Sequence, residues 1–251
     1  MMAKLTVGDV VFGEGRPKII VPIVGKNEEE ILEAASNIKT IDCDLVEWRI
    51  DFFDKVEEQG EVSELSKKIR KIIDRPLLVT FRTKKEGGVL ELSDNKYFEV
   101  YNEVVENGNI DLLDVELFMP VEEVSALIEK AHVNDVKIVM CNHDFDKTPV
   151  RDEIVNRLTA MSKKGADICK IAVMPNSNKD VITLLDATRI AKEKINQPLI
   201  TMSMGALGMI SRVSGEVFGS TATFGAAKQS SAPGQVPVAQ LREMLDTLKL
   251  N

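Results

Sequence analysis

The sequence predicts an α/β fold of the (β/α)8 barrel type, preceded by a short N-terminal hairpin. The chain has 251 residues and is 44% hydrophobic, which is enough to build a barrel-sized core. Eight apolar strand-like runs alternate with helical patterns, and such alternation indicates a parallel sheet. Polar residues also gather on one face of the predicted strands. A closed barrel brings such residues to a common axis.

The predicted elements follow one another without an internal repeat or a linker, so residues 1–251 are expected to form a single domain. Residues 1–16 hold a hairpin that turns at Gly8 and Asp9. The strand-like runs then lie at residues 18–25, 44–51, 77–82, 112–118, 137–143, 168–174, 198–204 and 221–225. The helical patterns lie at residues 28–39, 62–73, 96–106, 121–133, 151–164, 180–194, 206–213 and 237–248.

Residues typical of helix starts support several of these boundaries. Asn27 and Ser93 stand just before helical patterns, where a side-chain oxygen can accept a backbone N–H of the first turn. Pro120 and Pro237 are expected at first helical positions, because a helix needs no N–H there.

One face of the predicted strands carries most of their ionisable side chains. Taking every second position, this face holds Glu47, Arg49, Thr80, Arg82, Asp114, Glu116, Cys141, His143, Lys170, Met202 and Met204. The opposite face is apolar and suits a shell of helices. In a barrel the charged residues can pair or meet a ligand on the axis, whereas an open sheet would bury them separately under helices.

Composition excludes several classes of partner. With 32 basic and 40 acidic residues the formal charge is −8, which argues against binding to nucleic acid or to an anionic membrane surface.

Cys43, Cys141 and Cys169 have no C-x-x-C spacing, which favours buried thiols in a reducing compartment over disulfides or a metal site. No apolar run approaches the ~18 residues of a membrane span, and the N-terminus has no signal-peptide core. We therefore expect a cytoplasmic protein without a metal.

Two ionisable residues stand out in neighbouring apolar runs. Lys170 interrupts the run at residues 168–174, so its ammonium is either paired or has a depressed pKa that frees a nucleophilic amine. A structural ion pair and a catalytic lysine are equally good interpretations of this residue alone. His143, at a predicted strand end, is a candidate proton carrier or a structural histidine. His132 lies in a helical segment and is expected to be a bystander.

The predicted loops at the C-terminal strand ends add further candidates. Glu86 precedes Gly87 and Gly88, and it either orients an imidazole or is a solvated loop charge. Arg212 follows the seventh strand, where a guanidinium would suit a carboxylate or a phosphate. Residues 225–235 are small, polar and rich in Gly and Pro, which predicts a mobile lid.

Taken in order, these motifs resemble those of the type I 3-dehydroquinate dehydratases, shikimate-pathway enzymes that form a lysine imine. The similar segments are 47–52 (EWRIDF), 80–88 (TFRTKKEGG), 114–117 (DVEL), 138–144 (IVMCNHD), 170–175 (KIAVMP), 203–212 (SMGALGMISR) and 231–235 (SAPGQ). Each motif is short, but together they cover nearly the whole chain. The resemblance agrees with the predicted barrel, whose active site would lie at the C-terminal strand ends.

The resemblance implies a role for each candidate. Lys170 would be the Schiff-base nucleophile, His143 the general acid/base, and Glu86 its hydrogen-bonded partner. Three residues would hold the substrate carboxylate, namely Arg212, Ser231 and Gln235. Three others would contact the ring hydroxyls, namely Glu47, Arg49 and Arg82. The implied substrate is 3-dehydroquinate, no metal or organic cofactor is required, and the implied assembly is a homodimer.

Two alternatives remain open at this stage. A class I aldolase also forms an imine on a barrel lysine, but its substrates are often phosphorylated, and Gly205 and Gly208 are the one candidate phosphate cradle near the last strands. A non-catalytic barrel that binds a small carboxylate would keep the arginines without turnover. The combination of Lys170, His143 and Glu86 argues against that second alternative.

Overall fold

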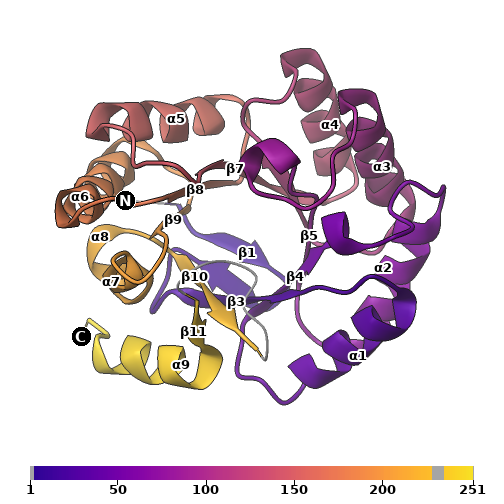
Figure 1. Ribbon diagram of the computed structural model, residues 1–251, viewed down its shortest axis with the longest axis horizontal. Coiled ribbons are helices and arrows are strands. Elements are labelled where there is room, and N and C mark those ends of the chain that lie inside the picture. The colour runs from indigo at the N-terminus through magenta and orange to yellow at the C-terminus, as the bar shows by residue number, and fades with distance from the viewer. Residues whose placement is uncertain (1–2, 228–234, 251) are drawn as a thin grey trace.

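Eight parallel strands form a barrel in a computed structural model that describes residues 3–227 and 235–250, as Figure 1 shows in a view along the barrel. The strands are β3 (Lys18–Ile23), β4 (Leu45–Arg49), β5 (Leu77–Thr80), β6 (Leu112–Glu116), β7 (Lys137–Asp144), β8 (Ile168–Val173), β9 (Leu199–Ser203) and β10 (Ala222–Ala226). Successive strands from β3 to β9 pair with one another, and β10 pairs with β3. The barrel closes between β9 and β10, where the N–H of Thr221, just before β10, donates to the Leu199 carbonyl at 2.7 Å. The predicted barrel fold is confirmed.

Helices surround the strands, as the alternation predicted (Figure 1). The longer ones are α1 (Glu28–Ile38), α2 (Glu61–Ile72), α3 (Asp94–Asn107), α4 (Val121–Val133), α5 (Arg151–Lys163), α6 (Asn178–Lys194) and α9 (Val238–Thr247). Short elements complete the chain: α7 (Met209–Val213), α8 (Gly215–Phe218), the 3-10 turns η1 (Ile50–Phe52) and η2 (Lys84–Glu86), and strand β11 (Val236–Pro237), which pairs with β10. No helix in the described ranges is both long and apolar enough to cross a membrane.

The predicted helix starts are confirmed with one correction. The side chain of Asn27 accepts the Glu30 N–H at 3.0 Å, and that of Ser93 accepts the Lys96 N–H at 3.3 Å. Pro120 and Pro237 precede their helices by one residue instead of occupying the first helical position. Both prolines have extended ψ angles, 131° and 137°, so the helical turn begins only at the next residue.

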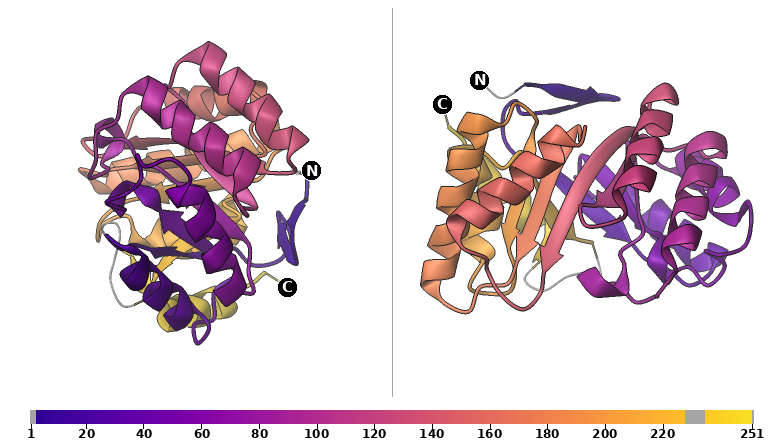
Figure 2. Two further views of the ribbon diagram at one scale, coloured as in Figure 1. Left: turned by 90° about the vertical axis from the view of Figure 1, so that its right-hand side faces the viewer. Right: turned by 90° about the horizontal axis from the view of Figure 1, so that it is seen from above.

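One end of the barrel interior is filled by apolar side chains alone. The predicted hairpin, β1 (Leu5–Val7) and β2 (Val10–Phe12), is antiparallel and lies across the end where the strands begin (Figure 2, right). Its buried side chains pack against the first inward layer of the barrel: Ile20, Leu45, Leu78, Leu112, Val139, Ile168 and Ile200. This end is therefore closed by apolar packing, and the polar inward residues lie toward the other end.

Aspartates that precede three strands make hydrogen bonds at the end of the barrel where the strands begin. Each carboxylate accepts a backbone N–H from the neighbouring strand: Asp44 from Ile19 at 2.7 Å, Asp111 from Leu77 at 2.7 Å and Asp167 from Ile138 at 2.8 Å. Each also pairs with a basic side chain: Arg242, Arg70 and His132, respectively. These bonds help to hold the strand register, because a register shift would turn inward side chains outward. His132 therefore lies at the opposite end from the polar residues.

Candidate active site

A cavity of about 220 Å³ lies within the polar end of the barrel. It brings together eight of the nine predicted site residues: Glu47, Arg49, Arg82, Glu86, His143, Lys170, Arg212 and Gln235. Ser231 and most of the predicted lid lie outside the described residues. The rest of the wall is mainly apolar and includes Phe145, Ala172, Met202, Met204 and Phe224. A few convergent polar groups in an apolar cavity are typical of a small-molecule site.

Lys170 is buried on β8 and is paired. Its Nζ donates to Asp114 Oδ2 at 2.9 Å, lies 3.8 Å from Glu47 Oε1, and lies 4.8 Å from the centre of the Phe224 ring. Burial alone would lower the pKa of Lys170, but the carboxylates of Asp114 and Glu47 outweigh it and raise the pKa. Of the two states predicted for this lysine, the paired ammonium is present. It must lose a proton before it can attack a carbonyl.

Asp114 is the shared counterion of two cations. Arg82 Nη2 donates to Asp114 Oδ1 at 2.6 Å, and Arg82 Nη1 donates to Glu116 Oε1 at 2.8 Å. Burial opposes ionisation of Asp114, but the charges of Arg82 and Lys170 outweigh it and hold its pKa well below the usual range. Asp114 therefore stays ionised at neutral pH. The sequence placed it on the charged strand face but did not identify it as a partner of Lys170.

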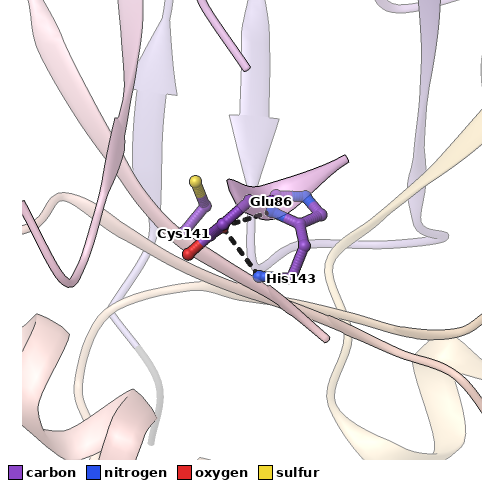
Figure 3. A group of neighbouring side chains, drawn as sticks. All are labelled: Glu86, Cys141 and His143. Carbon is purple, nitrogen blue, oxygen red and sulfur yellow. Dashed lines mark hydrogen bonds and ion pairs between the residues drawn. The ribbon is translucent and has the colours of Figure 1, made fainter. Parts of the chain in front are cut away.

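Glu86 and His143 form a hydrogen-bonded pair beside Lys170. Glu86 Oε2 accepts the His143 backbone N–H at 2.8 Å and lies 2.9 Å from Nδ1, as Figure 3 shows. Burial of Glu86, together with the nearby carboxylate of Glu116, raises its pKa to about 7. When Glu86 is ionised it can only accept, so Nδ1 carries the ring hydrogen and Nε2 is left with its lone pair.

His143 is suited to act as a base. Its burial, with the nearby charges of Arg82 and Lys170, lowers the pKa of the imidazole well below its usual value. The ring is therefore neutral at pH 7, as a proton acceptor must be. Two of the predicted catalytic residues thus have complementary states in the unliganded site, because Lys170 has a proton to lose and His143 can take one.

Two glycines position Glu86. Gly87 has a φ of 88°, a left-handed conformation that side chains disfavour. A Cβ on Gly88 would lie 1.8 Å from the Arg82 carbonyl oxygen, so a side chain cannot fit there. The tight turn after η2 brings the carboxylate back against β7. The pair of glycines seen in the sequence thus has a structural cause, and Glu86 is not a solvated loop charge, since it is 7% exposed.

Arg49 and Glu47 on β4 are also held by neighbours. Arg49 makes a bidentate pair with Asp51, with Nε to Oδ1 at 2.7 Å and Nη2 to Oδ2 at 2.9 Å. Glu47 Oε1 accepts the Thr80 hydroxyl at 2.9 Å. Asp51 was not predicted as a site residue. Its position two residues after Arg49 is a signal that could have suggested the pair, because a turn at the strand end brings such neighbours together.

Arg212 brings a fourth cation to the cavity from α7. The Ser203 N–H donates to Ser211 Oγ at 2.9 Å, which ties α7 to the end of β9. Burial lowers the pKa of Arg212 to about 10, so the guanidinium is still charged at neutral pH. Gln235 lines the same cavity. Although the chain has a charge of −8, its cavity presents the cations that an anionic ligand needs.

One group of side chains has the spacing of a metal site. Glu86, Cys141 and His143 offer an oxygen, a sulfur and a nitrogen that lie within 4.8 Å of one another (Figure 3). However, Arg82 Nη1 lies 3.1 Å from Cys141 Sγ and 3.7 Å from Glu86 Oε2. Burial also raises the pKa of the Cys141 thiol well above its usual value, whereas a metal needs the thiolate. A guanidinium already supplies the positive charge in this group, so the residues do not fit a metal.

The comparisons with known proteins decide the family. The model of a family described as Type I 3-dehydroquinase matches residues 19–251. The chain belongs to the type I 3-dehydroquinase family. This confirms the resemblance that the motifs indicated, and it places the chain in a family whose activity agrees with the lysine, histidine and glutamate found together here.

Individual relatives match this chain over nearly its whole length. The 3-dehydroquinate dehydratase of Listeria innocua is 56% identical over 248 residues, 98% of either chain. That of Bacillus subtilis is 50% identical over 252 residues, 100% of this chain and 99% of the relative. The solved type I 3-dehydroquinate dehydratase of Clostridium difficile has a TM-score of 0.95 at 47% identity, covering 99% of this chain and 98% of that one.

Proposed function

We propose that the chain is a 3-dehydroquinate dehydratase, a hydro-lyase that removes water from 3-dehydroquinate through an imine on Lys170. The observation that carries this proposal is that Lys170, His143 and Glu86 line one cavity in a member of the type I 3-dehydroquinase family. The solved C. difficile relative contains covalently modified comenic acid, which supports covalent chemistry in the family. Family membership does not favour an aldolase or a non-catalytic barrel.

Imine formation begins with transfer of a proton from Lys170. The substrate carboxylate pairs with Arg212, and the C3 carbonyl lies against the lysine. Neutral His143 takes the proton of the ammonium, and the free amine attacks C3 to form a carbon–nitrogen bond. The carbonyl oxygen then takes one proton from the nitrogen and one back from His143, and it leaves as water to give the iminium. Asp114 remains an anion next to the resulting iminium, which it stabilises as it stabilised the ammonium.

Dehydration uses the same histidine. The iminium withdraws electrons and acidifies the adjacent C2–H, so His143 can remove that proton at Nε2. Glu86 accepts the Nδ1–H throughout and stabilises the imidazolium. The imidazolium then protonates the departing C1 hydroxyl, and a double bond forms between C1 and C2. Water hydrolyses the imine and releases 3-dehydroshikimate with free Lys170.

Turnover itself is measured from the ultraviolet absorbance of the conjugated product. The purified chain should convert 3-dehydroquinate without added metal, and dialysis against EDTA should leave the rate unchanged. A chain that folds but gives no conjugated product would refute the proposed function. Dependence of the rate on a metal would contradict the proposed mechanism.

Activity should rise with pH around 7. The active form requires an ionised Glu86, whose pKa of about 7 lies above the usual value for a glutamate. Below that pH Glu86 is protonated and neutral, so it no longer stabilises the imidazolium that forms when His143 takes a proton. We therefore expect the acidic limb of kcat/KM near pH 7, and we expect Glu86→Gln to remove this limb while lowering kcat. A limb at the ordinary glutamate pKa of about 4.3 would show that Glu86 is not the controlling group.

Arg212→Ala should weaken recognition of the substrate carboxylate. A charge-assisted hydrogen bond is worth about 1.5–3 kcal/mol, so kcat/KM should fall roughly 10- to 150-fold. Arg212→Lys should recover only part of this loss, because an ammonium lacks the planar fork. If Gln235 contacts the same carboxylate, the double variant with Gln235→Ala should lose less than the sum of the single losses.

The matched control for this cycle is Arg189→Ala, a change of an exposed arginine on α6 that does not line the cavity, and it should leave kcat/KM unchanged. Strict additivity of Arg212→Ala and Gln235→Ala would assign the two residues to different parts of the substrate. A parent-like kcat/KM in Arg212→Ala would exclude the carboxylate role. Glu47, Arg49 and Arg82 are proposed at the ring hydroxyls, and Ser231 at the carboxylate, on the family resemblance.

We further propose one domain over residues 1–251, a homodimer and a cytoplasmic location. The shared core of barrel and helices supports the first, and the family resemblance supports the second. The unpaired and buried Cys43, Cys141 and Cys169 support a reducing compartment. Light scattering at micromolar concentration tests the dimer, and a monomer mass would contradict it. Cooperative unfolding in a single transition tests the domain, and cell fractionation tests the location.

A further inference from the structure

The hydrogen-bond chain that begins at His143 continues beyond Glu86 to the helix shell. Glu86 Oε1 accepts the Asn142 side-chain N–H at 2.9 Å. Asn142 Oδ1 in turn accepts from Arg157 Nη1 at 2.9 Å. Asn142 is 3% exposed, and it lies on β7 between Cys141 and His143, so its side chain is on the face that packs against the helices. Arg157 is on α5 and does not line the substrate cavity.

The hydrogen bond from Arg157 is compatible with only one orientation of the Asn142 amide. An amide can present either its oxygen or its nitrogen, whereas a guanidinium can only donate. With Arg157 in place, Oδ1 is turned toward the guanidinium and Nδ2 toward Glu86. That orientation suits an ionised Glu86, which can only accept. The opposite orientation would set an oxygen against the carboxylate and would suit only a protonated Glu86.

The Arg157 side chain is itself held in place. Nε donates to Glu153 Oε1 at 2.8 Å, and the guanidinium carbon lies 5.6 Å from the centre of the Phe118 ring. The side chain is 19% exposed. A second cavity of about 320 Å³ reaches the back of the pair and is lined by Glu86, His143, Asn142 and Arg157 among others. Arg157 thus joins the outer side of the barrel to the acid/base pair without touching the substrate.

We propose that Arg157 is a positioning residue, which keeps the Asn142 amide in its donor orientation and so keeps the Glu86–His143 pair ready to accept the substrate proton. The inference rests on the proposed function, because it assigns that pair the proton transfers. Arg157 acts only through Asn142. Removing it should therefore favour the protonated form of Glu86 and raise the pH at which the pair becomes an ionised carboxylate beside a neutral imidazole.

Other charged groups also face the pair, and they stay in place when Arg157 is changed. Arg49, Arg82 and Lys170 line the substrate cavity, Asp114 pairs with Arg82 and Lys170, and the neutral thiol of Cys141 lies beside the pair. Those around the second cavity, besides Arg157, are Lys85, Asp94, Glu116 and Asp144. Burial and Glu116 raise the pKa of Glu86, while Arg82, the Asn142 hydrogen bond and the His143 backbone N–H lower it. Loss of the amide donor therefore shifts that balance toward the protonated form.

Two variants and a matched control test this proposal. Arg157→Met removes the donor and the charge, Arg157→Lys keeps a donor-only cation, and Arg151→Met removes another arginine from the same helix. In Arg157→Met the acidic limb of kcat/KM should move upward by roughly half a pH unit or more, with a loss of roughly 2- to 10-fold at pH 7. Arg157→Lys should lie between parent and Arg157→Met, and Arg151→Met should match the parent.

A double-mutant cycle tests the route through the amide. In an Asn142→Ala background, Arg157→Met should cost nothing further in kcat/KM, because its effect passes through Asn142. Additive losses would contradict the proposal. The proposal would also be overturned if Arg157→Met and Arg157→Lys lowered the unfolding temperature equally while their pH profiles of kcat/KM superimposed on that of the parent. Arg157 would then be a structural residue.

A readout without turnover separates this inference from the proposed function. The chain has only two histidines, so NMR spectra of protein labelled with ¹⁵N-histidine contain two rings, and His132 serves as an internal reference. The titration of the His143 ring signals should move to higher pH in Arg157→Met and not in Arg151→Met. An unshifted titration overturns the inference even if the enzyme is active. An inactive parent with the expected shift refutes the proposed function alone.

Discussion

Lys170→Ala will abolish turnover of 3-dehydroquinate while leaving the barrel folded. Without the amine no iminium forms, so the C2–H keeps its ordinary acidity and His143 has no stabilised product of proton removal. Loss of a covalent nucleophile can cost on the order of 10⁶-fold in kcat, which is the expected scale here. The fold should survive because Asp114 keeps its pair with Arg82 at 2.6 Å and is not left as an isolated buried charge.

The measurement is kcat together with the thermal unfolding temperature. Lys137→Ala is the matched control, since Lys137 begins β7 at the opposite end of the barrel and pairs with Asp135. It should retain parent activity. If Lys170→Ala turns over at a near-parent rate, the lysine is not the nucleophile. If that variant fails to fold, Lys170→Met, which fills more of the same volume, gives the comparison.

His143→Ala should slow turnover by about 10²–10⁴-fold, the usual value of general acid/base catalysis. The loss affects both proton transfers, because the same imidazole takes the C2 proton and protonates the leaving hydroxyl. Imine formation should slow but continue, since water can accept the Lys170 proton less effectively. The variant should therefore accumulate an adduct that borohydride reduces to a stable secondary amine.

His132→Ala is the control for this variant, because His132 pairs with Asp167 at the N-terminal end of the barrel. It should alter stability at most and leave kcat unchanged. Unchanged kcat in His143→Ala would show that another group transfers the protons. Binding of substrate without any trapped adduct would show that His143 is also required for imine formation.

Most of the fold could be predicted because one periodic pattern repeats along the chain. Every strand-like run became a barrel strand, and the boundaries moved by only a few residues where helix ends and strand ends fray. The candidate site could be predicted for a related reason. The ends of parallel strands meet at one edge, so Lys170, His143 and Arg82, far apart in sequence, converge once the barrel closes.

The partners of these residues could not be predicted, because they depend on side-chain reach between strands. Alternation placed Asp114 inside the barrel, but the register decides that it meets both Arg82 and Lys170. Alternation also directs Asn142 outward, where its link to Arg157 depends on how α5 packs on β7. The charge state of Lys170 depends on such contacts, since the nearby carboxylates of Asp114 and Glu47 favour a paired ammonium over a free amine.

The most direct test of the account is to trap the adduct. The protein is incubated with 3-dehydroquinate, reduced with sodium borohydride and digested, and the modified peptide is identified by mass spectrometry. We expect one reduced adduct per chain, on the peptide that holds Lys170, and none in Lys170→Ala. An adduct on another lysine, or full turnover by a chain in which no adduct can be trapped, would contradict the assignment of Lys170 as the covalent nucleophile.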